Sequence, residues 1–473
     1  MFKPSFAPDK NCPAAKAEIA PLFPSLPALG DKKVSAAFDG GRITSDGGVM
    51  LLASPQARKL CDRLAGLVPD DRDQTRVSHS ISDMFFARCL AIAAGYEDAD
   101  DLDDLRHDPM FKMAVGKTPD AKVGLVSQPT MSRWENKSDL RVAIQMAYAS
   151  VDFYCESHDT PPASITLDID ETFDAAYGEQ QLAFWNGFYG ERGFLPIHVY
   201  ETETGRPVAF ILRTAKTPSG EELCAHIRRL IRRIRIHWPE TRILLRADGH
   251  YSRSEVMAWC EAQENLDYIF GLATNAALRK DARVVATADA CAVVRAEGGQ
   301  PMLRTHCETE YAAASWGKAK RRVVARIEAT TLGMDIRYIV TSLTNSTPER
   351  LYEFTYCARG QAENLIKLHK TQLKSDRTSC SSALANQLRL TLHTVAYWML
   401  WHVQRAMPDA AVLKHAEFAT LQNRLVKIGA RVIETATRIR IAFASACPDK
   451  DLFVQVLTRL FGRTAAHAQA QAP

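Results

Sequence analysis

Strand and helix patterns alternate between residues 163 and 273 in an order that few folds can accommodate. The segment ASITLDID (163–170) alternates apolar and polar residues as a strand does, and FLPIHVYETETGRPVAFILRT (194–214) indicates two strands joined by a turn. An arginine-rich helix, a buried strand (TRILLRA), a second helix and a further strand (DYIFGLA) follow. Three strands, a helix, a strand, a helix and a strand predict an α/β (α+β) fold with a mixed sheet and flanking helices.

Acidic residues stand on the polar face and at the ends of these strands. Asp168 and Asp170 share one face of the first strand, and Asp248 closes the strand TRILLRAD. An apolar strand rarely carries two acids on one face unless solvent or a cation meets them. The alternative for Asp248 is a capping residue at a strand-to-helix turn. We expect these carboxylates to lie at one region of the sheet.

The stretch YCARGQAENLIKLHK (356–370) carries charged residues at helical spacing. An α-helix turns by about 100° per residue, which places Tyr356, Arg359, Glu363 and Lys370 within about 60° of one another, with Lys367 beside them. One interpretation is a solvated helix face crossed by salt bridges. The other is a metal-binding carboxylate set among phosphate-binding cations. The partner carboxylates on the strands favour the second interpretation.

Convergent carboxylates have a defined chemistry. Two or three of them can hold a pair of divalent ions, one of which activates the attacking oxygen while the other stabilises the leaving oxygen of a phosphodiester. Hard oxygen ligands favour Mg²⁺ or Mn²⁺ over zinc. The acidic residues therefore predict a two-metal site for phosphoryl transfer.

Basic residues gather in separate segments, although the net charge is only +4. HIRRLIRRIRIHW (226–238) and GKAKRRVVAR (317–326) are rich in arginine and lysine, as a phosphate backbone requires. In SQPTMSRWEN (127–136), Thr130, Arg133 and Asn136 share a face, as in a DNA-recognition helix. A solvated helix face is the alternative for the arginine helix, and an ordinary short helix is the alternative for residues 127–136.

Composition indicates a soluble protein of more than one domain. The chain has 473 residues, of which 46% are hydrophobic and 24% charged. Eleven cysteines form no CxxC pair, so reduced thiols are expected. The N-terminus has no signal-peptide core, and the run LHTVAYWMLWHV is too short to cross a bilayer. We expect an intracellular protein without a membrane partner.

The remaining segments are assigned from composition and periodicity. The predicted regions are an irregular N-terminal segment (1–75), a helical DNA-binding region (76–158), a catalytic domain in two parts (159–274 and 336–376), a β-rich insertion between them (275–335), a helical C-terminal region (377–462) and a disordered tail (463–473). RVVATADACAVVRA, within the insertion, is expected to be β-like, and RIRIAFAS (438–445) to be a strand.

Taken in order, LDIDET, LRADGHY and YCARGQAENLIKLHK resemble the three acidic motifs of DDE-type transposases of bacterial insertion sequences, in particular transposase DDE domain group 1. TSDGG, GYEDADDLDDLRHDP, QQLAFWNGFYG, SDRTSCSSALANQLRL and RLVKIGARV also resemble this group, so the likeness covers nearly the whole chain. The resemblance implies a ribonuclease-H-like catalytic domain and two Mg²⁺ ions, for which Mn²⁺ can substitute. It implies Asp170, Asp248 and Glu363 as metal-binding catalytic residues, with Asp168 as the alternative first acid.

The resemblance also assigns DNA-binding residues. It implies that Tyr356, Arg359 and Lys370 hold DNA phosphates, and Lys367 on the same helix face is assigned the same role. It also implies that an aromatic residue in the insertion stacks on a base. Trp316, followed by Arg321 and Arg322, is the candidate for the insertion, and an ordinary core position is the alternative for Trp316.

The implied function is that of a DNA transposase. Such an enzyme binds the terminal inverted repeats of its element, cleaves the ends and transfers the 3′-hydroxyl strands to target DNA. A homodimer bridging two ends, in the bacterial cytoplasm and at the nucleoid when bound to DNA, is expected. The alternatives are a catalytically silent DNA-binding derivative and a ribonuclease-H-like nuclease without strand transfer.

Overall fold

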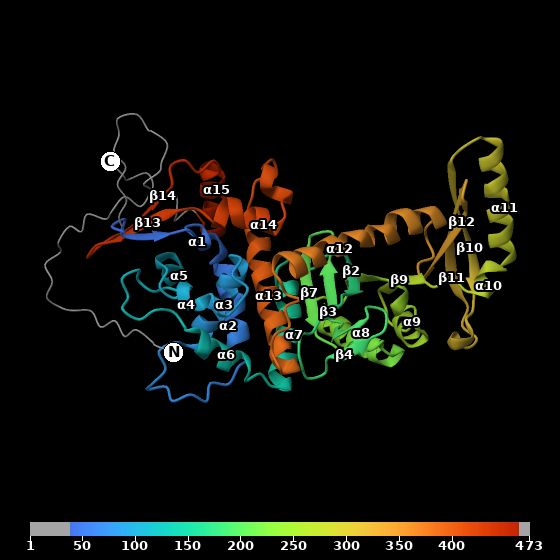
Figure 1. Cartoon of the computed structure of the whole chain (residues 1–473). Coiled ribbons are helices and arrows are strands. Elements are labelled where there is room, and N and C mark those ends of the chain that lie inside the picture. The colour runs from blue at the N-terminus through green and yellow to red at the C-terminus, as the bar shows by residue number, and fades with distance from the viewer. Residues whose placement is uncertain (1–37, 463–473) are drawn as a thin grey trace.

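The computed structural model describes residues 38–462, and the predicted tail at 463–473 lies outside this range. The molecule is elongated (Figure 1). The N-terminal and C-terminal regions lie together at one end, and a large sheet occupies the centre. The segment between β9 (Leu266–Leu272) and β12 (Gly333–Thr341) forms the other end. Among the described residues, no helix is long and apolar enough to cross a membrane.

An eight-stranded mixed sheet forms the centre, in the order β10-β11-β12-β9-β8-β2-β6-β7. The strands are β2 (Ser164–Glu171), β6 (Ile197–Glu201), β7 (Arg206–Ile211), β8 (Arg242–Ala247), β9 (Leu266–Leu272), β10 (Met302–Tyr311), β11 (Arg321–Thr330) and β12 (Gly333–Thr341). β2, β8 and β9 are parallel, whereas β6 runs antiparallel to both of its neighbours, β2 and β7. This order and these directions are those of a ribonuclease-H-like fold, which confirms the predicted class.

Helices cover the sheet as the sequence order predicts. α8 (Gly220–His237) begins at Ser219, whose hydroxyl accepts from the Glu222 amide. It buries both leucines and three of its four isoleucines against the core, and Ile236 is exposed. α9 (Ser254–Glu261) connects β8 to β9, with the short helix η1 (Gly249–Tyr251) before it. Crossover through a helix is the connection that parallel neighbours such as β8 and β9 require.

The insertion differs from the prediction in one element. The segment RVVATADACAVVRA lies in a helix, α11 (Ala282–Glu297), preceded by the short α10 (Ala276–Arg279). The Asp281 side chain accepts from the Arg283 and Val284 amides and so caps α11. The prediction of β-like structure there was wrong, because an alanine-rich run with an N-cap outweighs the strand preference of valine.

A run of mixed helical geometry extends from the insertion across the central sheet toward the C-terminal region (Figure 1). It comprises η3 (Arg350–Tyr356, a π-helix), η4 (Cys357–Arg359), α12 (Gly360–Lys367) and η5 (Leu368–Gln372, a π-helix). The sequence predicted one regular α-helix here. The π-turns, which place more residues in each turn, change the direction of the side chains along the run.

The N-terminal and C-terminal regions pack on each other. The N-terminal helices are α1 (Val49–Leu52), α2 (Pro55–Ala65), α3 (Ile81–Ala93), α4 (Leu102–Leu105), α5 (Pro109–Ala114), α6 (Gln128–Glu135) and α7 (Leu140–Glu156). The C-terminal elements are α13 (Ala383–Arg405), η6 (Val412–His415), α14 (Phe418–Leu421), η7 (Gln422–Val426), β13 (Ala430–Glu434), β14 (Ile439–Phe443) and α15 (Lys450–Phe461).

Two further findings concern these regions. β1 (Arg42–Thr44) joins β13 and β14 in a three-stranded antiparallel sheet, which confirms the predicted strand at 438–445. The segment 1–75, expected to be irregular apart from a helix-like run after the turn at 43–53, contains β1, α1 and α2; the expected helical run is confirmed as α2, whereas β1 was not predicted. Ser54 caps α2, and Pro55 occupies the first helical position.

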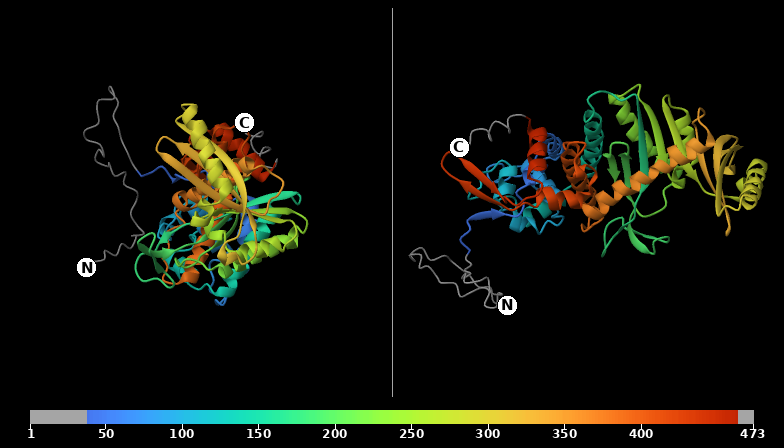
Figure 2. Two further views of the ribbon diagram at one scale, coloured as in Figure 1. Left: turned by 90° about the vertical axis from the view of Figure 1, so that its right-hand side faces the viewer. Right: turned by 90° about the horizontal axis from the view of Figure 1, so that it is seen from above.

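A third, small sheet projects between β2 and β6. It consists of β3 (Asp174–Ala175), β4 (Phe184–Asn186) and β5 (Glu191–Phe194), in the order β3-β5-β4. Figure 2 (right) shows this sheet standing away from the main body.

Candidate active site

Asp170 and Asp248 lie at the same end of the central sheet because β2 and β8 are parallel neighbours. Ile169 is paired with Ala247, so the next residue of each chain segment is one of the two aspartates. The Asp248 carboxylate accepts from the His250 amide at 2.9 Å and caps η1, and its side chain remains one-third exposed. The expected capping role of Asp248 is therefore present together with its position beside Asp170.

The carboxyl group of Asp170 has an unusual environment. Burial is the main cause that raises its pKa to about 6; Arg359 opposes the shift, and the negative charges of Asp248 and Glu363 contribute to it. One carboxylate oxygen accepts from the Glu171 amide at 2.9 Å, and the other pairs with Arg359. Asp170 thus lies within the electrostatic influence of two further acidic side chains, as expected for a cation site.

Asp168 points from the same face of β2 but lies deeper. It is fully buried, and its two oxygens pair with the Arg246 guanidinium at 2.5 and 2.7 Å. Thr202 donates a third hydrogen bond to it at 2.5 Å. Both carboxylate oxygens are therefore occupied, and these contacts favour Asp170 over Asp168 as the first acid.

Arg246 was not predicted to matter, although it links three elements around the site. Its guanidinium also donates to the Thr355 carbonyl at 2.6 Å, so it ties β2 and β8 to η3. A buried arginine opposite an aspartate on the neighbouring strand, Asp168 against Arg246, is the signal that could have revealed this pair.

Glu363 approaches the aspartates through Arg359. One Arg359 nitrogen lies 2.9 Å from Asp170, and the other lies 3.6 Å from the Glu363 carboxylate. The Glu363 side chain is 67% exposed. The expected common face of the helix is thus turned toward the end of β2, with arginine between the first and third acids.

The other cations of this helix contact protein groups. Lys370 donates to Thr172 Oγ1 at 3.2 Å and to the Phe173 carbonyl, and it lies 3.3 Å from the buried Asp174 carboxylate. Burial raises the pKa of Asp174 to about 7, and Lys370 opposes that shift. Lys370 therefore holds residues 172–174, the segment that directly follows Asp170 and Glu171.

Tyr356 and Lys367 differ in exposure. Tyr356 is half-buried, and its hydroxyl lies close to the Gly271 backbone. A Cβ atom added to Gly271 would lie 2.7 Å from the Tyr356 hydroxyl oxygen. Lys367 is exposed and pairs with Glu417 at 3.1 Å. An exposed ion pair of this kind contributes little to stability, so Lys367 can exchange Glu417 for another partner at small cost.

Glu171 and His250 form a second group that sequence reasoning missed. The Glu171 carboxylate is buried without a hydrogen-bond partner among the described residues, and it lies 3.8 Å from both Arg213 and His250. His250 lies 3.7 Å from Asp248, and the pKa of His250 is raised by the Glu171 carboxylate. The adjacent DE and GH pairs in LDIDET and LRADGHY are the signal for this group.

The predicted residues of the insertion are engaged in internal contacts. Trp316 is buried, and its ring packs edge-to-face on Tyr311 with Arg321 above it. Arg321 is bidentate to Glu261, and Arg322 pairs with Glu308 and donates to three backbone carbonyls. These contacts argue against the expected base stacking by Trp316 and phosphate binding by the two arginines.

The predicted DNA-reading helix exists as α6. Arg133 is exposed, and it donates to Thr130 Oγ1 at 3.2 Å. The opposite side of α6 buries Met131 and Trp134, so the polar face is turned outward as expected. In the arginine helix α8, Arg233 pairs with Asp152, and Arg235 donates to four backbone carbonyls.

The donors at the candidate site are of the type that divalent ions prefer. Asp170 and Asp248 are adjacent oxygen ligands, and the raised pKa of Asp170 indicates a site where a further positive charge is favoured. Among residues 38–462, no three acidic, histidine or cysteine side chains are already gathered around a metal position. Glu363 completes such a group only if Arg359 withdraws from between the acids.

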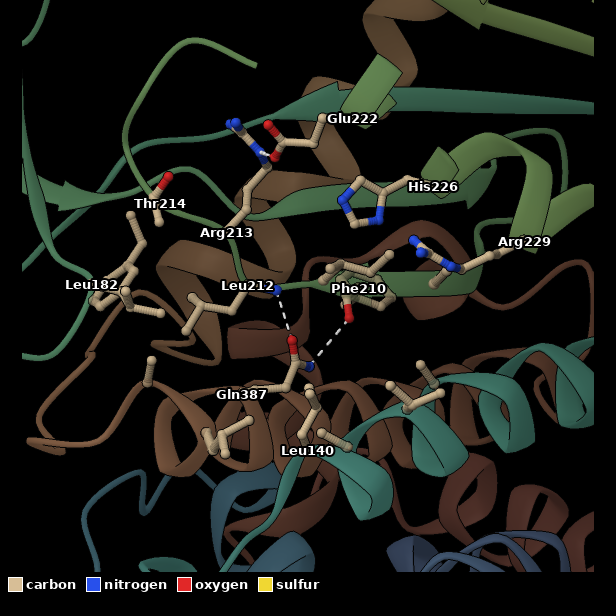
Figure 3. A pocket seen from close by; sticks show the side chains of 18 of the residues that line it. Leu140, Leu182, Phe210, Leu212, Arg213, Thr214, Glu222, His226, Arg229 and Gln387 are labelled. Atoms are coloured by element: carbon tan, nitrogen blue, oxygen red, sulfur yellow. Dashed lines mark hydrogen bonds and ion pairs between the residues drawn. The ribbon is translucent and has the colours of Figure 1, made fainter. Parts of the chain in front are cut away.

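A pocket of about 760 Å³ lies elsewhere, between α7, α8, β7 and α13. Its lining is mostly apolar, as Figure 3 shows. The Gln387 amide donates to the Phe210 carbonyl and accepts from the Leu212 amide across this pocket (Figure 3). It thereby satisfies the open edge of β7, where a sheet would otherwise present unpaired backbone groups.

The ribonuclease-H-like sheet, the two aspartates at adjacent strand ends and the glutamate of a later helix define the class of the DDE transposases. The chain belongs to the family described as transposase DDE domain group 1, which matches residues 26–464. It is accordingly a metal-dependent enzyme of DNA strand cleavage and transfer. This confirms the class inferred from the three acidic motifs.

One solved structure illustrates how far the likeness to other proteins extends. The piggyBac transposase in a synaptic complex with hairpin DNA is 10% identical, with a TM-score of 0.41, over 91% of this chain and 83% of that one. No curated protein matches the chain.

Proposed function

We propose that Asp170, Asp248 and Glu363 form the catalytic metal site. The carboxylates would hold two Mg²⁺ ions, with Mn²⁺ as a substitute, and the ions would supply charge neutralisation and an activated oxygen. The observation that carries this assignment is the position of Asp170 and Asp248 at the ends of parallel neighbouring strands, with Arg359 between Asp170 and Glu363. Asp168 is already engaged in a buried ion pair with Arg246, which supports Asp170 as the first ligand.

Arg359 is proposed to bind the DNA phosphate at the cut. It now lies between Asp170 and Glu363, so binding of the polyanion would draw its guanidinium away from one carboxylate. Planar guanidinium groups contact phosphate oxygens in pairs, which orients the phosphodiester as well as attracting it. Tyr356 and Lys367 would contact neighbouring phosphates, while Lys370 would act mainly by positioning residues 172–174.

The proposed reaction has two steps. Water attacks the phosphodiester at the element end, an oxygen–phosphorus bond forms, and the 3′ oxygen leaves as a hydroxyl. That 3′-hydroxyl then attacks a phosphodiester of target DNA, so one bond is formed for each bond broken. The family supports the class of reaction, and the order of its steps is part of the proposal.

The proposed substrate is duplex DNA that carries the terminal inverted repeats of a bacterial insertion sequence. The exposed polar face of α6, with Thr130 and Arg133, would contact the repeat. Two copies of the chain would bridge two ends, because both ends of an element must be cut for it to move. The enzyme would act in the bacterial cytoplasm, on the nucleoid.

The test is cleavage of a labelled duplex that carries the flanking element end, with target plasmid and either Mg²⁺ or EDTA. We expect metal-dependent nicking and joining by the unaltered enzyme, and binding without nicking by Glu363→Ala. Loss of end binding together with nicking in Glu363→Ala would contradict the proposed role of Glu363.

The same assay separates the alternatives. Specific binding without any metal-dependent nicking would identify a DNA-binding derivative. Nicking without joining to the plasmid would identify a nuclease of the ribonuclease-H-like class.

A further inference from the structure

The small sheet between β2 and β6 presents large aromatic side chains to solvent. We call residues 184–194 (β4, its turn and β5) the aromatic hairpin. Phe188 is 90% exposed and Trp185 is 63% exposed, with Tyr189 beside them. Exposed aromatic side chains grouped on one short element are uncommon on a soluble protein unless they contact a partner.

The aromatic hairpin is held in a defined conformation. The Asn186 side chain accepts from the Phe188 and Tyr189 amides at 2.9 and 3.3 Å and donates to the Ala215 carbonyl at 2.8 Å. Gly190 has a φ of 68°, which closes the turn. The exposed rings are thus carried by an ordered turn, so little conformational entropy is lost when they bind a partner.

Contacts at its base attach the aromatic hairpin to the candidate active site. Tyr189 stacks on Phe173 with ring centroids 4.4 Å apart and planes 12° apart. Phe173 is three residues beyond Asp170, and the Phe173 carbonyl accepts from Lys370. Burial and then the charges of Asp170, Glu171 and Asp248 raise the pKa of Tyr189.

Close packing fixes this attachment. A Cβ at Gly193 would lie 2.2 Å from the Asp174 carbonyl oxygen and 2.7 Å from the Phe173 ring. At Gly193 the backbone of the aromatic hairpin therefore packs directly against Phe173 and Asp174, with no room for a side chain.

Two cations lie beside the exposed rings of the aromatic hairpin, together with one acid, the exposed Glu191. Lys216 lies 4.3 Å above the Phe184 ring, and Arg192 is exposed on β5. Cations interleaved with exposed rings are the arrangement by which proteins bind unpaired nucleic-acid strands, since the rings stack on bases while the cations meet phosphates.

We propose that the aromatic hairpin binds unpaired nucleotides of the DNA strand whose phosphodiester lies at the carboxylates, with bases stacked on Trp185 and Phe188. This inference rests on the proposed function, because it takes the carboxylates as the place where the strand is cut. It assigns the stacking surface to an element of the catalytic domain itself, in place of the buried Trp316 of the insertion.

The fluorescence of Trp185 can report DNA binding at the aromatic hairpin. All seven tryptophans lie within the described residues, and Trp185 is the only one of them that is exposed. We expect its fluorescence to be quenched when the full chain, in EDTA, binds an element-end duplex with a single-stranded 3′ extension. The fully paired duplex of the same sequence should quench much less.

Substitutions test the stacking contribution. Phe188→Ala should weaken binding of the extended duplex by about 5- to 100-fold, the range for loss of one stacked base, and Phe188→Tyr should restore it. Because Phe188 is almost wholly exposed, its replacement leaves the core unchanged. Phe443→Ala, which removes a partly exposed aromatic from the remote strand β14, is the matched control and should bind normally.

Two results would overturn the proposal: equal quenching by paired and extended duplexes, or equal weakening by Phe188→Ala and Phe443→Ala. Binding in EDTA requires no cleavage, so the two proposals fail separately. Quenching without metal-dependent nicking would leave the hairpin as a DNA-binding element of a silent protein. Nicking without selective quenching would leave the catalytic proposal intact and remove this one.

Discussion

At the scale of single residues, Asp168 and Asp170 illustrate how two acids on one strand face acquire different environments. Asp168 is neutralised by a bidentate arginine and a threonine hydroxyl within the sheet. Asp170, two residues further, is partly buried, pairs with Arg359, and has its pKa raised to about 6, mainly by burial. The first arrangement stabilises the fold, whereas the second leaves negative charge in excess, as a cation site requires.

The substitutions Asp168→Asn and Asp170→Asn should therefore separate stability from activity. Asp168→Asn leaves the buried Arg246 without its counter-charge, and we expect the free energy of unfolding to fall by about 3–5 kcal/mol. Asp170→Asn should abolish strand cleavage while it leaves the free energy of unfolding within about 1 kcal/mol of the original. Denaturant unfolding and the cleavage assay measure the two effects. A stable, inactive Asp168→Asn variant beside an active Asp170→Asn variant would reverse the assignment.

The raised pKa of Asp170 also predicts how pH affects stability. Because the folded-state pKa, about 6, lies above the ordinary 3.8, the protonated form favours the folded state. This stabilisation is fully present below about pH 4 and is lost as pH rises through about 6, a change of about 1 kcal/mol between pH 5 and 7.5. Asp170→Asn cannot ionise, so the unfolding free energy of the unaltered enzyme should fall relative to this variant over that interval.

Divalent ions should compete with this proton. We expect Mg²⁺ to raise the melting temperature of the unaltered enzyme at about pH 7.5 and to have much less effect near pH 5, where Asp170 is mostly protonated. Differential scanning fluorimetry with Mg²⁺ and after chelation measures the shift. An equal shift in Asp170→Asn would show that the ion binds elsewhere.

At the scale of elements, the sequence predicted the catalytic strands well because their signals are local. Alternation in ASITLDID, the turn before β7 and the buried run before Asp248 each specify a strand without reference to the rest of the chain. The π-turns in η3 and η5 left no such signal. They follow from contacts that are distant in sequence, such as Arg246 with the Thr355 carbonyl and Lys370 with Thr172.

In the insertion, by contrast, a local sequence signal was present and was misread. Valine pairs in RVVATADACAVVRA suggested strands, although the segment is bounded by a capping Asp281 and by Gly298 and Gly299. These end signals identify α11 as a helix. The internal roles of Trp316, Arg321 and Arg322 had no local signal, because Glu261 and Glu308, which bind the two arginines, lie in other elements.

Two glycines of the aromatic hairpin give a matched test of its placement. Gly193→Ala would bring a Cβ within 2.2 Å of the Asp174 carbonyl oxygen, whereas nothing lies within 4 Å of a Cβ at Gly187. We expect Gly193→Ala to displace the hairpin and to reduce strand cleavage at least about tenfold, and Gly187→Ala to cleave within about twofold of the original, by analogy with ordinary surface changes of about 0.5 kcal/mol. Initial rates on the labelled duplex measure both. Equal rates for the two variants would show that the hairpin position does not matter.

At the scale of the whole molecule, α13 joins regions that are distant in sequence. It packs on α1, α2, α3 and α7 of the N-terminal region and on β7 of the sheet. Seventeen of its 23 residues are buried, which accounts for the length of its apolar run. The helical flanks are therefore continuous with the catalytic domain through one helix.

The insertion is joined to the catalytic sheet in the same way. β12 pairs with β11 on one side and with β9 on the other, so the strands of the insertion extend the sheet without a break. Val324 of β11 packs with Ile269 of β9 and with Leu351 and Tyr352 of η3 in one buried cluster. The boundary predicted at residue 335 therefore falls inside the paired region, after β12 has begun at Gly333.

This continuity predicts that damage within the insertion reaches the catalytic helix. Val324→Ala removes two buried methyl groups from the shared cluster, and we expect the free energy of unfolding to fall by about 2 kcal/mol. Amide exchange should accelerate in β9 and η3 as well as in β11, and strand cleavage should fall because η3 leads to Arg359 and Glu363. Leu332→Ala, at a side chain that is 99% exposed in the β11–β12 turn, is the control and should alter neither. Faster exchange confined to β10 and β11 would instead make the insertion a unit that folds independently of the sheet.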